Sequence, residues 1–343
     1  MNAAMLEPST PPAPPTVTMR AIVQDAYGAG PEDVLRLGEV ARPVVGDGEI
    51  LVRVAAASVD RGTWHVMAGT PYLMRVAGFG VRAPKATNPG RCFAGTVESV
   101  GKDVTGLAPG DEVFGTAEGS FAEYVAAKPA QVAHKPAGLS FEQAAAVPIS
   151  GATALQAVRD RAKVTAGEKV LIIGASGGVG SFAVQIAKAF GAEVTAVASG
   201  AKANLVRELG ADHVIDYERE DFAGGEHRYD VVLDIGGTSR LSRLRHALTP
   251  RGRLVIVGGM SAGKWFGGID RQLRAQLLSP FVGQKLGTFV ASENSDDLVA
   301  LRELIDAGEV TPAIHRSYPL GEVPAAIRSL LDGEVRGKVV ITV

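Results

Sequence analysis

A glycine-rich turn between an apolar strand and a helix constrains the fold of this chain more than any other segment. Residues 174–180 read Gly-Ala-Ser-Gly-Gly-Val-Gly, after the apolar run 170–173 and before a predicted helix at 181–190. Glycines allow the backbone to turn tightly and to approach a pyrophosphate, while the helix N-terminus supplies N–H groups and a positive dipole end. A strict G-x-G-x-x-G pattern would need glycine in place of Ala175. The predicted dinucleotide contacts are Ala175, Ser176, Gly177, Gly178, Val179 and Gly180.

The turn belongs to a long stretch in which predicted strands alternate with helical segments. The predicted strands are apolar, β-branched runs at 170–173, 193–197, 213–215, 231–234, 253–257 and 286–290. This alternation is typical of βαβ units, whose strands form a parallel sheet with helices on both faces. We therefore predict an α/β fold in which residues 147–291 form a doubly wound Rossmann domain.

The flanking segments predict a second domain that is rich in β-structure. Between residues 18 and 146, short β-type runs are interrupted by Gly, Pro and Asp. A helix is expected from Phe141, with Ser140 as its N-cap. The segment 292–343 contains two further helical segments and a closing strand. Residues 1–17 are crowded with proline and are predicted to form a disordered tail.

Composition argues against several classes of partner and site. Lys and Arg total 35 against 37 Asp and Glu, so the net charge is −2. Such a balance gives no broad attraction for nucleic acid or an anionic membrane, and we expect neither as a partner. The single cysteine, Cys92, excludes an intramolecular disulfide and a zinc site made of several thiolates. A reducing compartment, the cytoplasm, is therefore the expected location.

The end of the second Rossmann strand predicts which nicotinamide cofactor binds. NAD enzymes place an acid about twenty residues after the glycine turn, where it binds the ribose 2′-hydroxyl. Here the strand ends in Ser-Gly-Ala-Lys, without an acid, so that Ser199 and Lys202 could bind a 2′-phosphate. Tyr217 is a candidate to flank the adenine. We favour NADP(H) over NAD(H); the alternative is that Lys202 is an ordinary exposed lysine at the start of a helix.

Ordered landmarks along almost the whole chain resemble those of one family. They lie at 56–60, 89–95, 110–115, 119–125, 146–153, 175–180 and 337–340. On these segments the chain resembles the quinone oxidoreductase-like (zeta-crystallin-like) branch of the zinc-free medium-chain dehydrogenase/reductase superfamily. The resemblance implies a GroES-like β-rich catalytic domain, made from residues 18–146 and 292–343, beside the Rossmann domain. It also implies a homodimer and NADPH-dependent hydride transfer to a quinone or an α,β-unsaturated carbonyl.

The resemblance assigns further cofactor contacts. Thr153 and the glycines after two of the Rossmann strands are expected along the nicotinamide and its ribose. These glycines are Gly236, Gly237, Gly258 and Gly259. Lys338 aligns with a basic family residue near the pyrophosphate.

The same resemblance argues against zinc and suggests candidates for catalysis. Zinc-dependent relatives have cysteine at the position of Asp60 and a His-Glu pair at that of Arg91 and Cys92, so no metal site is expected. The candidate catalytic residues are Asp60, His65 and Arg91, each with a simpler alternative. Asp60 could be structural, because an ionised carboxylate cannot donate to an oxyanion. His65 could donate a proton or be a satisfied core residue, and Arg91 could polarise a carbonyl or form an ion pair. Cys92 is expected to be a buried thiol.

Substrate class remains open at the level of sequence. Trp64, Tyr72 and Phe79 could form an apolar wall suited to flat conjugated substrates, or they could pack as ordinary core residues. Two other functions compete with quinone or enone reduction. One is a zinc-free, NADP-dependent alcohol or aldehyde dehydrogenase, and the other is an NADPH-binding structural or regulatory protein.

Overall fold

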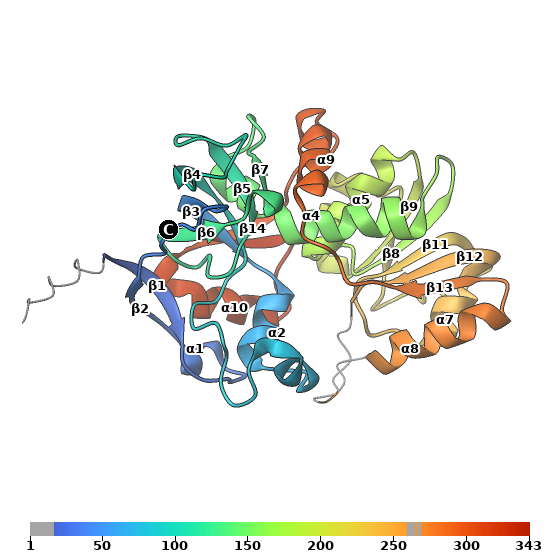
Figure 1. The fold of residues 1–343 in the computed structure, drawn as a ribbon. Coiled ribbons are helices and arrows are strands. Elements are labelled where there is room, and N and C mark those ends of the chain that lie inside the picture. Colours follow the sequence, from blue (N-terminus) through green and yellow to red (C-terminus); the bar gives the residue numbers. More distant parts are fainter. Residues whose placement is uncertain (1–16, 259–264, 266–268) are drawn as a thin grey trace, which may run out of the picture.

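The computed structural model describes residues 17–258, 265 and 269–343, and contains two large sheets at opposite ends of the molecule (Figure 1). One belongs to a GroES-like domain and the other to a Rossmann domain, so the predicted α/β fold class is confirmed. Residues 1–16 of the predicted tail and the predicted cofactor residue Gly259 lie outside the described residues.

The Rossmann sheet is parallel throughout, with the strand order β10-β9-β8-β11-β12-β13. Its strands are β8 (Lys169–Ile173), β9 (Glu193–Ala198), β10 (His213–Asp216), β11 (Tyr229–Asp234), β12 (Leu248–Ile256) and β13 (Lys285–Thr288). The order reverses between β8 and β11, and ligands of such sheets bind outside the carboxyl ends of the strands at this switch point. The six predicted strands all form, although the last is shorter than the predicted 286–290.

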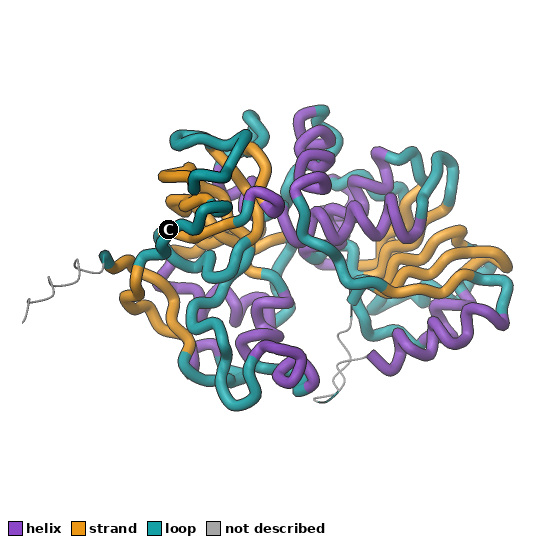
Figure 2. The backbone as a smooth tube through the Cα atoms, in the orientation of Figure 1, coloured by secondary structure: helices purple, strands orange, loops and turns teal. Residues whose placement is uncertain are grey.

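Alternation along β8 explains why the sheet is covered on both faces. Successive side chains of a strand point to opposite faces. Val170 and Ile172 accordingly belong to a core that contains Phe182 of α5, whereas Leu171 belongs to another that contains Leu244 of α7. Figure 2 shows helices on both sides of this sheet. The helices that follow its strands are α5 (Gly178–Ala189), α6 (Ala203–Glu208), α7 (Leu241–His246) and α8 (Ile269–Leu278).

The GroES-like sheet joins segments from the two ends of the chain. Its order is β14-β15-β3-β4-β5-β7, with β6 also paired to β3. The strands are β3 (Ile50–Val59), β4 (Cys92–Val100), β5 (Glu112–Thr116), β6 (Tyr124–Ala127), β7 (Val132–His134), β14 (Ile314–Pro319) and β15 (Lys338–Thr342). Because β15 pairs antiparallel with β3, the red and blue segments lie side by side in Figure 1. A separate hairpin, β1 (Thr18–Gln24) with β2 (Leu35–Ala41), lies beside this sheet.

Helices connect the two sheets. The predicted cap of α3 (Phe141–Ala145) is confirmed, because Ser140 Oγ accepts from Gln143 N at 3.2 Å and Gln143 Oε1 accepts from Ser140 N at 3.0 Å. α4 (Pro148–Leu155) then crosses toward the Rossmann domain and packs against α5 and α9. The remaining helices are α1 (Pro31–Val34), α2 (Arg61–Ala68), α9 (Ser295–Asp306) and α10 (Val323–Leu331). Within the described ranges, no helix has the length and apolarity needed to cross a bilayer.

Candidate active site

The glycine turn between β8 and α5 has the conformation that a pyrophosphate site requires. Gly174 has a φ of +84°, which L side chains rarely adopt. A Cβ on Gly180 would stand 2.1 Å from the carbonyl oxygen of Gly174, so only glycine fits where α5 packs against the turn. Ala175 is fully buried in the turn, and its methyl group is accommodated where the strict pattern has glycine.

The N-terminus of α5 leaves room for a ligand. A Cβ on Gly177 would have only the Gly174 carbonyl within 4 Å, at 3.5 Å, so this face of the turn is open. The carbonyl oxygen of Ser176 accepts from Gly337 N at 2.8 Å, which joins the turn to the residue before β15. An open backbone cradle at the N-terminus of a helix fits a pyrophosphate, because the helix dipole and free N–H groups favour an anion.

Two further turns follow β11 and β12 and touch the first. A Cβ on Gly174 would stand 2.8 Å from Gly236 N, and one on Gly258 would stand 2.1 Å from the carbonyl oxygen of Ile235. The three turns, 174–180, 235–239 and 257–258, therefore lie in contact at the carboxyl ends of β8, β11 and β12. We call them the nucleotide edge.

A cavity of about 380 Å³ opens beside the nucleotide edge. Gly174, Ser176 and Gly236 line it together with Tyr217, which is 60% exposed. Such a cavity at the switch point of a parallel sheet is the place expected for an adenosine. The structure thus brings Tyr217 close to the glycine turn, which is where a residue that flanks the adenine would have to lie.

The two candidate 2′-phosphate residues follow β9. Lys202 Nζ donates to the carbonyl oxygens of Gly333 at 2.6 Å and Val335 at 2.8 Å. Burial and the neighbouring Arg336 lower the pKa of Lys202. Ser199 lies in the same turn, where its carbonyl accepts from Lys202 N at 2.9 Å. Lys202 therefore bridges this turn to the loop that precedes β15, with part of its hydrogen-bonding capacity already used.

Lys338 lies in a cluster of four buried polar side chains between the domains. Its ammonium donates to Asp60 Oδ1, to Ser150 Oγ at 3.2 Å and to the carbonyl oxygen of Val59 at 3.2 Å. Ser150 Oγ donates to Asp60 Oδ1 at 2.9 Å, and the Cys92 thiol donates to Asp60 Oδ2 at 3.1 Å. We call this group, Asp60, Ser150, Cys92 and Lys338, the buried cluster.

The buried cluster explains two of the sequence predictions. Both oxygens of Asp60 are hydrogen-bonded, which fits the structural alternative for this residue. Burial raises the pKa of Cys92 well above its usual range, and the carboxylate of Asp60 raises it further. A buried, protonated thiol is unreactive. A Cβ on Gly178 would stand 3.0 Å from Cδ of Lys338, so the aliphatic part of this lysine packs against the N-terminus of α5.

Thr153 and His65 both use their polar atoms within their own segments. Thr153 Oγ1 donates to the carbonyl oxygen of Ile149 at 2.7 Å on α4. His65 Nδ1 lies 2.9 Å from the carbonyl oxygen of Thr70; because a carbonyl only accepts, Nδ1 carries the proton. Burial lowers the pKa of His65. The positive charge of Arg61 lowers this pKa further, whereas the hydrogen bond to Thr70 acts in the opposite direction. The neutral ring is thus left with Nε2 as an acceptor, an arrangement that does not favour proton donation.

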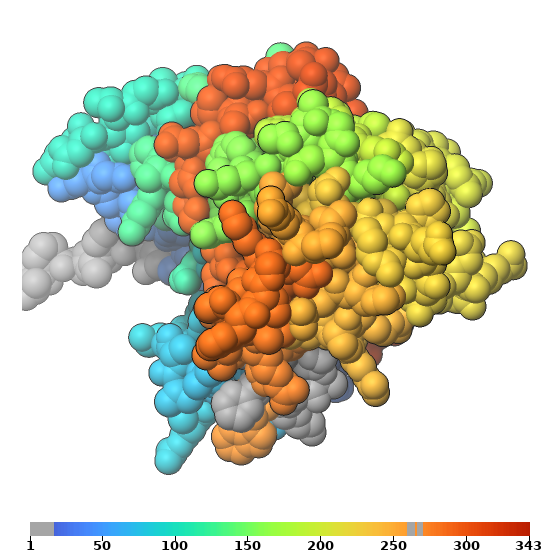
Figure 3. Space-filling model, turned by 90° about the vertical axis from the view of Figure 1, so that its right-hand side faces the viewer, coloured from blue at the N-terminus to red at the C-terminus, as the bar shows by residue number. Residues whose placement is uncertain are grey.

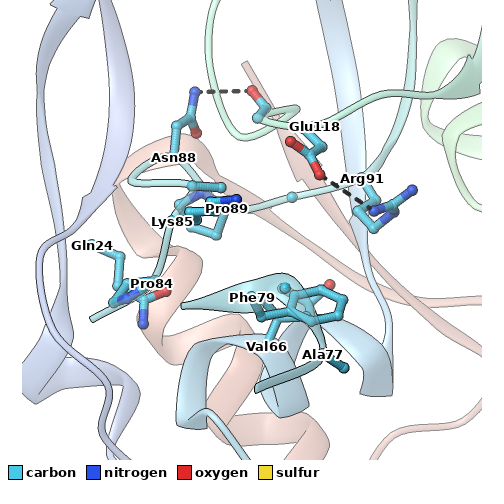
Figure 4. A pocket seen from close by; sticks show the side chains of 15 residues that line it. Gln24, Val66, Ala77, Phe79, Pro84, Lys85, Asn88, Pro89, Arg91 and Glu118 are labelled. Atoms are coloured by element: carbon cyan, nitrogen blue, oxygen red, sulfur yellow. Dashed lines mark hydrogen bonds and ion pairs between the residues drawn. The ribbon is translucent and has the colours of Figure 1, made fainter. Parts of the chain in front are cut away.

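Arg91 stands in the wall of an apolar pocket of about 530 Å³ in the GroES-like domain (Figure 4). Its Nη2 donates to Glu293 at 2.7 Å, in the segment that leaves the Rossmann sheet, and Nη1 lies 4.0 Å from Glu118. Burial alone would lower the pKa of Arg91, but the two carboxylates outweigh it and raise the pKa. Arg91 Nε is buried and has no hydrogen-bond partner among the described residues, while the side chain as a whole is 35% exposed.

The proposed aromatic wall is only partly brought together. Phe79 lines the apolar pocket, and Figure 4 shows it beside Val66 and Ala77, across from Arg91. Trp64 instead stacks edge-on against His65, with ring centroids 4.9 Å apart. Tyr72 meets Trp265, from the Rossmann domain, in an edge-on pair at 5.4 Å.

Several residues of the site carried no signal in the sequence. Ser150 lies within the recognised segment 146–153, but nothing marked it as the partner of a buried ion pair. Asp216, at the end of β10, lies against the turn after β9, where a Cβ on Gly200 would stand 2.6 Å from its Oδ2. Glu293 and Arg271 reach their partners across more than thirty residues of sequence. Such pairs become visible only when the fold is known.

Metal-binding geometry is absent from the part of the chain that the structure describes. No three His, Cys, Asp or Glu side chains are grouped there in a way that could hold a metal ion. Asp60 accepts from the Cys92 thiol and from the Lys338 ammonium, so both of its carboxylate oxygens already have hydrogen-bond partners.

Comparisons with known proteins agree with this geometry. Residues 46–137 match the family model "Alcohol dehydrogenase GroES-like domain", and residues 209–341 match "Zinc-binding dehydrogenase". The chain is 34% identical to mouse "NAD(P)H oxidoreductase RTN4IP1, mitochondrial", over 98% of this chain and 91% of that protein. It is 32% identical to "2-methylene-furan-3-one reductase" of Solanum lycopersicum, over 99% and 83%.

A solved structure supports the same relationship. Escherichia coli quinone oxidoreductase complexed with NADPH superposes with a TM-score of 0.80 at 26% identity, covering 95% of this chain and 100% of that one. The chain belongs to the medium-chain dehydrogenase/reductase superfamily, in its quinone-oxidoreductase-like branch, and is an NAD(P)H-dependent oxidoreductase.

Proposed function

We propose that this enzyme uses NADPH to reduce a quinone or an α,β-unsaturated carbonyl by two electrons, without zinc. The observation that carries the proposal is that one chain combines an open nucleotide edge with a largely apolar pocket in the GroES-like domain, whose wall contains Arg91. The names of the relatives point the same way, because one is a furanone reductase and another a quinone oxidoreductase.

In this proposal, bound NADPH supplies the hydride and the protein supplies binding, orientation and charge stabilisation. The turn 174–180 and the N-terminus of α5 bind the pyrophosphate, while the turns after β11 and β12 support the nicotinamide half. The apolar side chains of the pocket, such as Val66 and Phe79, exclude water from a flat substrate. The Arg91 guanidinium, whose side chain is 35% exposed, offers a hydrogen bond to a substrate oxygen as that oxygen gains charge.

The decisive experiment is a panel of electron acceptors. Oxidation of NADPH is followed with quinones, enones and aldehydes, and reduction of NADP⁺ is followed with alcohols. Turnover with quinones or enones is expected. Turnover restricted to aldehydes and alcohols would favour the alternative zinc-free dehydrogenase, which we retain because a solved relative is named "NAD-dependent alcohol dehydrogenase" at 30% identity.

Independence from zinc is part of the proposal. In the buried cluster an ammonium and a protonated thiol surround Asp60, so the carboxylate is already neutralised by a cation. Elemental analysis of the purified protein should therefore find less than one zinc per chain, and a chelator should leave activity unchanged. One tightly bound zinc per chain would overturn this part.

The choice of NADP over NAD is proposed on the turn after β9. No acid lies between Ser199 and Lys202, and Lys202 supplies a positive charge there. The nearby Asp216 is partly neutralised by Arg219, whose Nε lies 3.7 Å from its Oδ2. Comparing the dissociation constants of NADPH and NADH tests the choice, and tighter binding of NADH would reverse it.

A homodimer through the edge of the Rossmann sheet also remains a proposal. β13 ends the sheet, and nearby apolar side chains are exposed: Leu277 at 72%, Phe281 at 84% and Val290 at 93%. Figure 3 shows this orange segment on the face turned toward the viewer. An open strand edge with apolar neighbours is suited to a second copy. Sedimentation at micromolar concentration is expected to give a dimer, and a monomer would contradict it.

Cytoplasmic location stays a prediction that rests on the cysteine content. One relative carries "mitochondrial" in its name, which concerns that protein. Fluorescence microscopy of a tagged full-length chain in its source cell would decide the compartment.

A further inference from the structure

A buried ion pair ties the nucleotide edge to α8. Arg271, near the start of α8, donates from Nη1 to Asp234 Oδ2 at 2.6 Å. Asp234 is the last residue of β11 and is fully buried, and Arg271 is 9% exposed. Burial raises the pKa of Asp234, while Arg271 and a backbone N–H act in the opposite direction.

The same two side chains hold both nicotinamide turns. Arg271 Nη1 also donates to the carbonyl oxygen of Ser239 at 2.8 Å, and Nη2 donates to that of Gly258 at 2.9 Å. Asp234 Oδ1 accepts from Gly237 N at 3.1 Å. One guanidinium and one carboxylate thus contact the turn 235–239 at two points and the turn 257–258 at one.

Backbone hydrogen bonds complete the connection. The carbonyl oxygen of Asp234 accepts from Val257 N at 3.0 Å and from Gly258 N at 3.1 Å. Because Gly236 also lies directly against Gly174, any shift of the turn 235–239 would reach the pyrophosphate turn. Arg271 therefore bonds to two of the three turns of the nucleotide edge, and it is not among the residues that line the cavity beside that edge.

Net stability does not explain a pair of this kind. Removing two charges from water costs about as much as their attraction returns, so a buried ion pair is often no better than apolar residues of the same volume. A planar guanidinium, in contrast, fixes several acceptors in one geometry. This geometry is what two flexible glycine turns would otherwise lack.

We propose that Arg271, through Asp234, is a positioning residue that holds the two turns in the conformation needed by the nicotinamide half of the cofactor. The inference rests on the proposed function of these turns. It assigns a role to a residue that does not line the cavity beside the nucleotide edge, and it makes α8 part of the cofactor site.

The test combines a readout that needs no cofactor with one that does. In Arg271→Gln, backbone amide exchange of residues 235–239 and 257–258 in the apo protein is expected to accelerate. The dissociation constant of NADPH, measured by its fluorescence, is expected to rise about tenfold or more. The reason is that the two turns lose the charge-assisted hydrogen bonds from Arg271 that hold them in the binding conformation. Arg271→Lys keeps the positive charge without the planar guanidinium, and the dissociation constant of NADPH should rise less in this variant. If Arg271→Gln proves hard to fold, Arg271→Lys serves as the test variant.

A matched control lies at the opposite end of the same sheet. Arg253, within β12, donates from Nη2 to Glu168 at 2.5 Å, and Glu168 directly precedes β8. Arg253→Gln should change neither the exchange of the turns nor the affinity for NADPH. Equal effects of both variants would show that any lost ion pair loosens the sheet, and would overturn the proposal.

A double variant separates positioning from stability. Arg271→Gln leaves a buried carboxylate unpaired, so adding Asp234→Asn should restore part of the melting temperature without restoring the affinity. Recovery of both together would overturn the proposal. Unchanged exchange and affinity in a folded Arg271→Gln protein would also overturn it. A wild type that binds neither NADPH nor NADH would instead contradict the proposed function, and the exchange measurement would still report on Arg271.

Discussion

The nucleotide edge and the apolar pocket with its neighbouring buried cluster are built in different ways. The edge is made of backbone: Gly174, Gly180 and Gly258 fit because no Cβ could be accommodated there. The pocket and the cluster are made of side chains from segments far apart in sequence, such as Asp60 with Lys338. A backbone site is therefore broken by adding one carbon atom, whereas a side-chain site is broken by removing one partner of a pair.

The largest effect is expected when the buried cluster loses its carboxylate. Asp60→Ala leaves the ammonium of Lys338, 2% exposed, with only Ser150 and a backbone carbonyl as partners. Breaking a buried ion pair from one side costs about 3–5 kcal/mol. The free energy of unfolding, from urea titration at neutral pH, should fall by that amount.

A second substitution checks the cause of this loss. Asp60→Ala combined with Lys338→Met removes both charges, and most of the lost stability should return. If the single variant loses less than about 1 kcal/mol, or if the double variant is worse, the cluster is not a neutralised pair in a dry environment.

The next largest effect separates two glycines of the same turn. Gly180→Ala forces a Cβ to within 2.1 Å of a carbonyl oxygen, so about 1–3 kcal/mol of stability should be lost. In Gly177→Ala the new Cβ has only one atom within 4 Å, at 3.5 Å, so the free energy of unfolding should stay within about 0.5 kcal/mol of the wild-type value. Its methyl group would instead occupy the cradle, and the affinity for NADPH should fall about tenfold. Equal stability losses in the two variants would contradict this account of the turn.

The same difference explains what the sequence could predict. The six strands and the turn 174–180 follow from local patterns, because glycine spacing and β-branched runs specify backbone conformation directly. The pairs Arg91 with Glu293 and Arg271 with Asp234 could not be predicted, since each depends on how distant segments meet. The predicted strand 286–290 was wrong at its end, because the chain leaves the sheet after Thr288 and exposes Val290.

An effect of similar size is expected at the turn after β9, where a backbone turn and a charged side chain would both contribute to binding. Lys202→Ala should raise the dissociation constant of NADPH about ten- to a hundredfold, as expected for the loss of a charge-assisted contact worth roughly 1.5–3 kcal/mol. The dissociation constant of NADH, which lacks the 2′-phosphate, should barely change. Lys188→Ala is the control, because Lys188 pairs with Asp212 at 2.8 Å on the opposite side of the domain from this turn. The quantity to measure is the ratio of the two dissociation constants. A ratio unchanged by Lys202→Ala would mean that this lysine only bridges to the loop 333–335.

The smallest effect concerns His65, whose burial lowers its pKa relative to the unfolded chain. A histidine with a depressed native pKa binds protons less readily when folded, so its contribution to stability is present above the unfolded pKa and is lost as pH falls through the native one. The free energy of unfolding should therefore decrease between pH 7 and pH 5, near the unfolded pKa of about 6.5. His65→Gln, which can still donate to Thr70, should flatten this decrease, whereas His213→Gln, at an exposed position, should leave it unchanged. If His65→Gln instead preserves the slope and lowers kcat at saturating substrate, His65 serves as a proton donor.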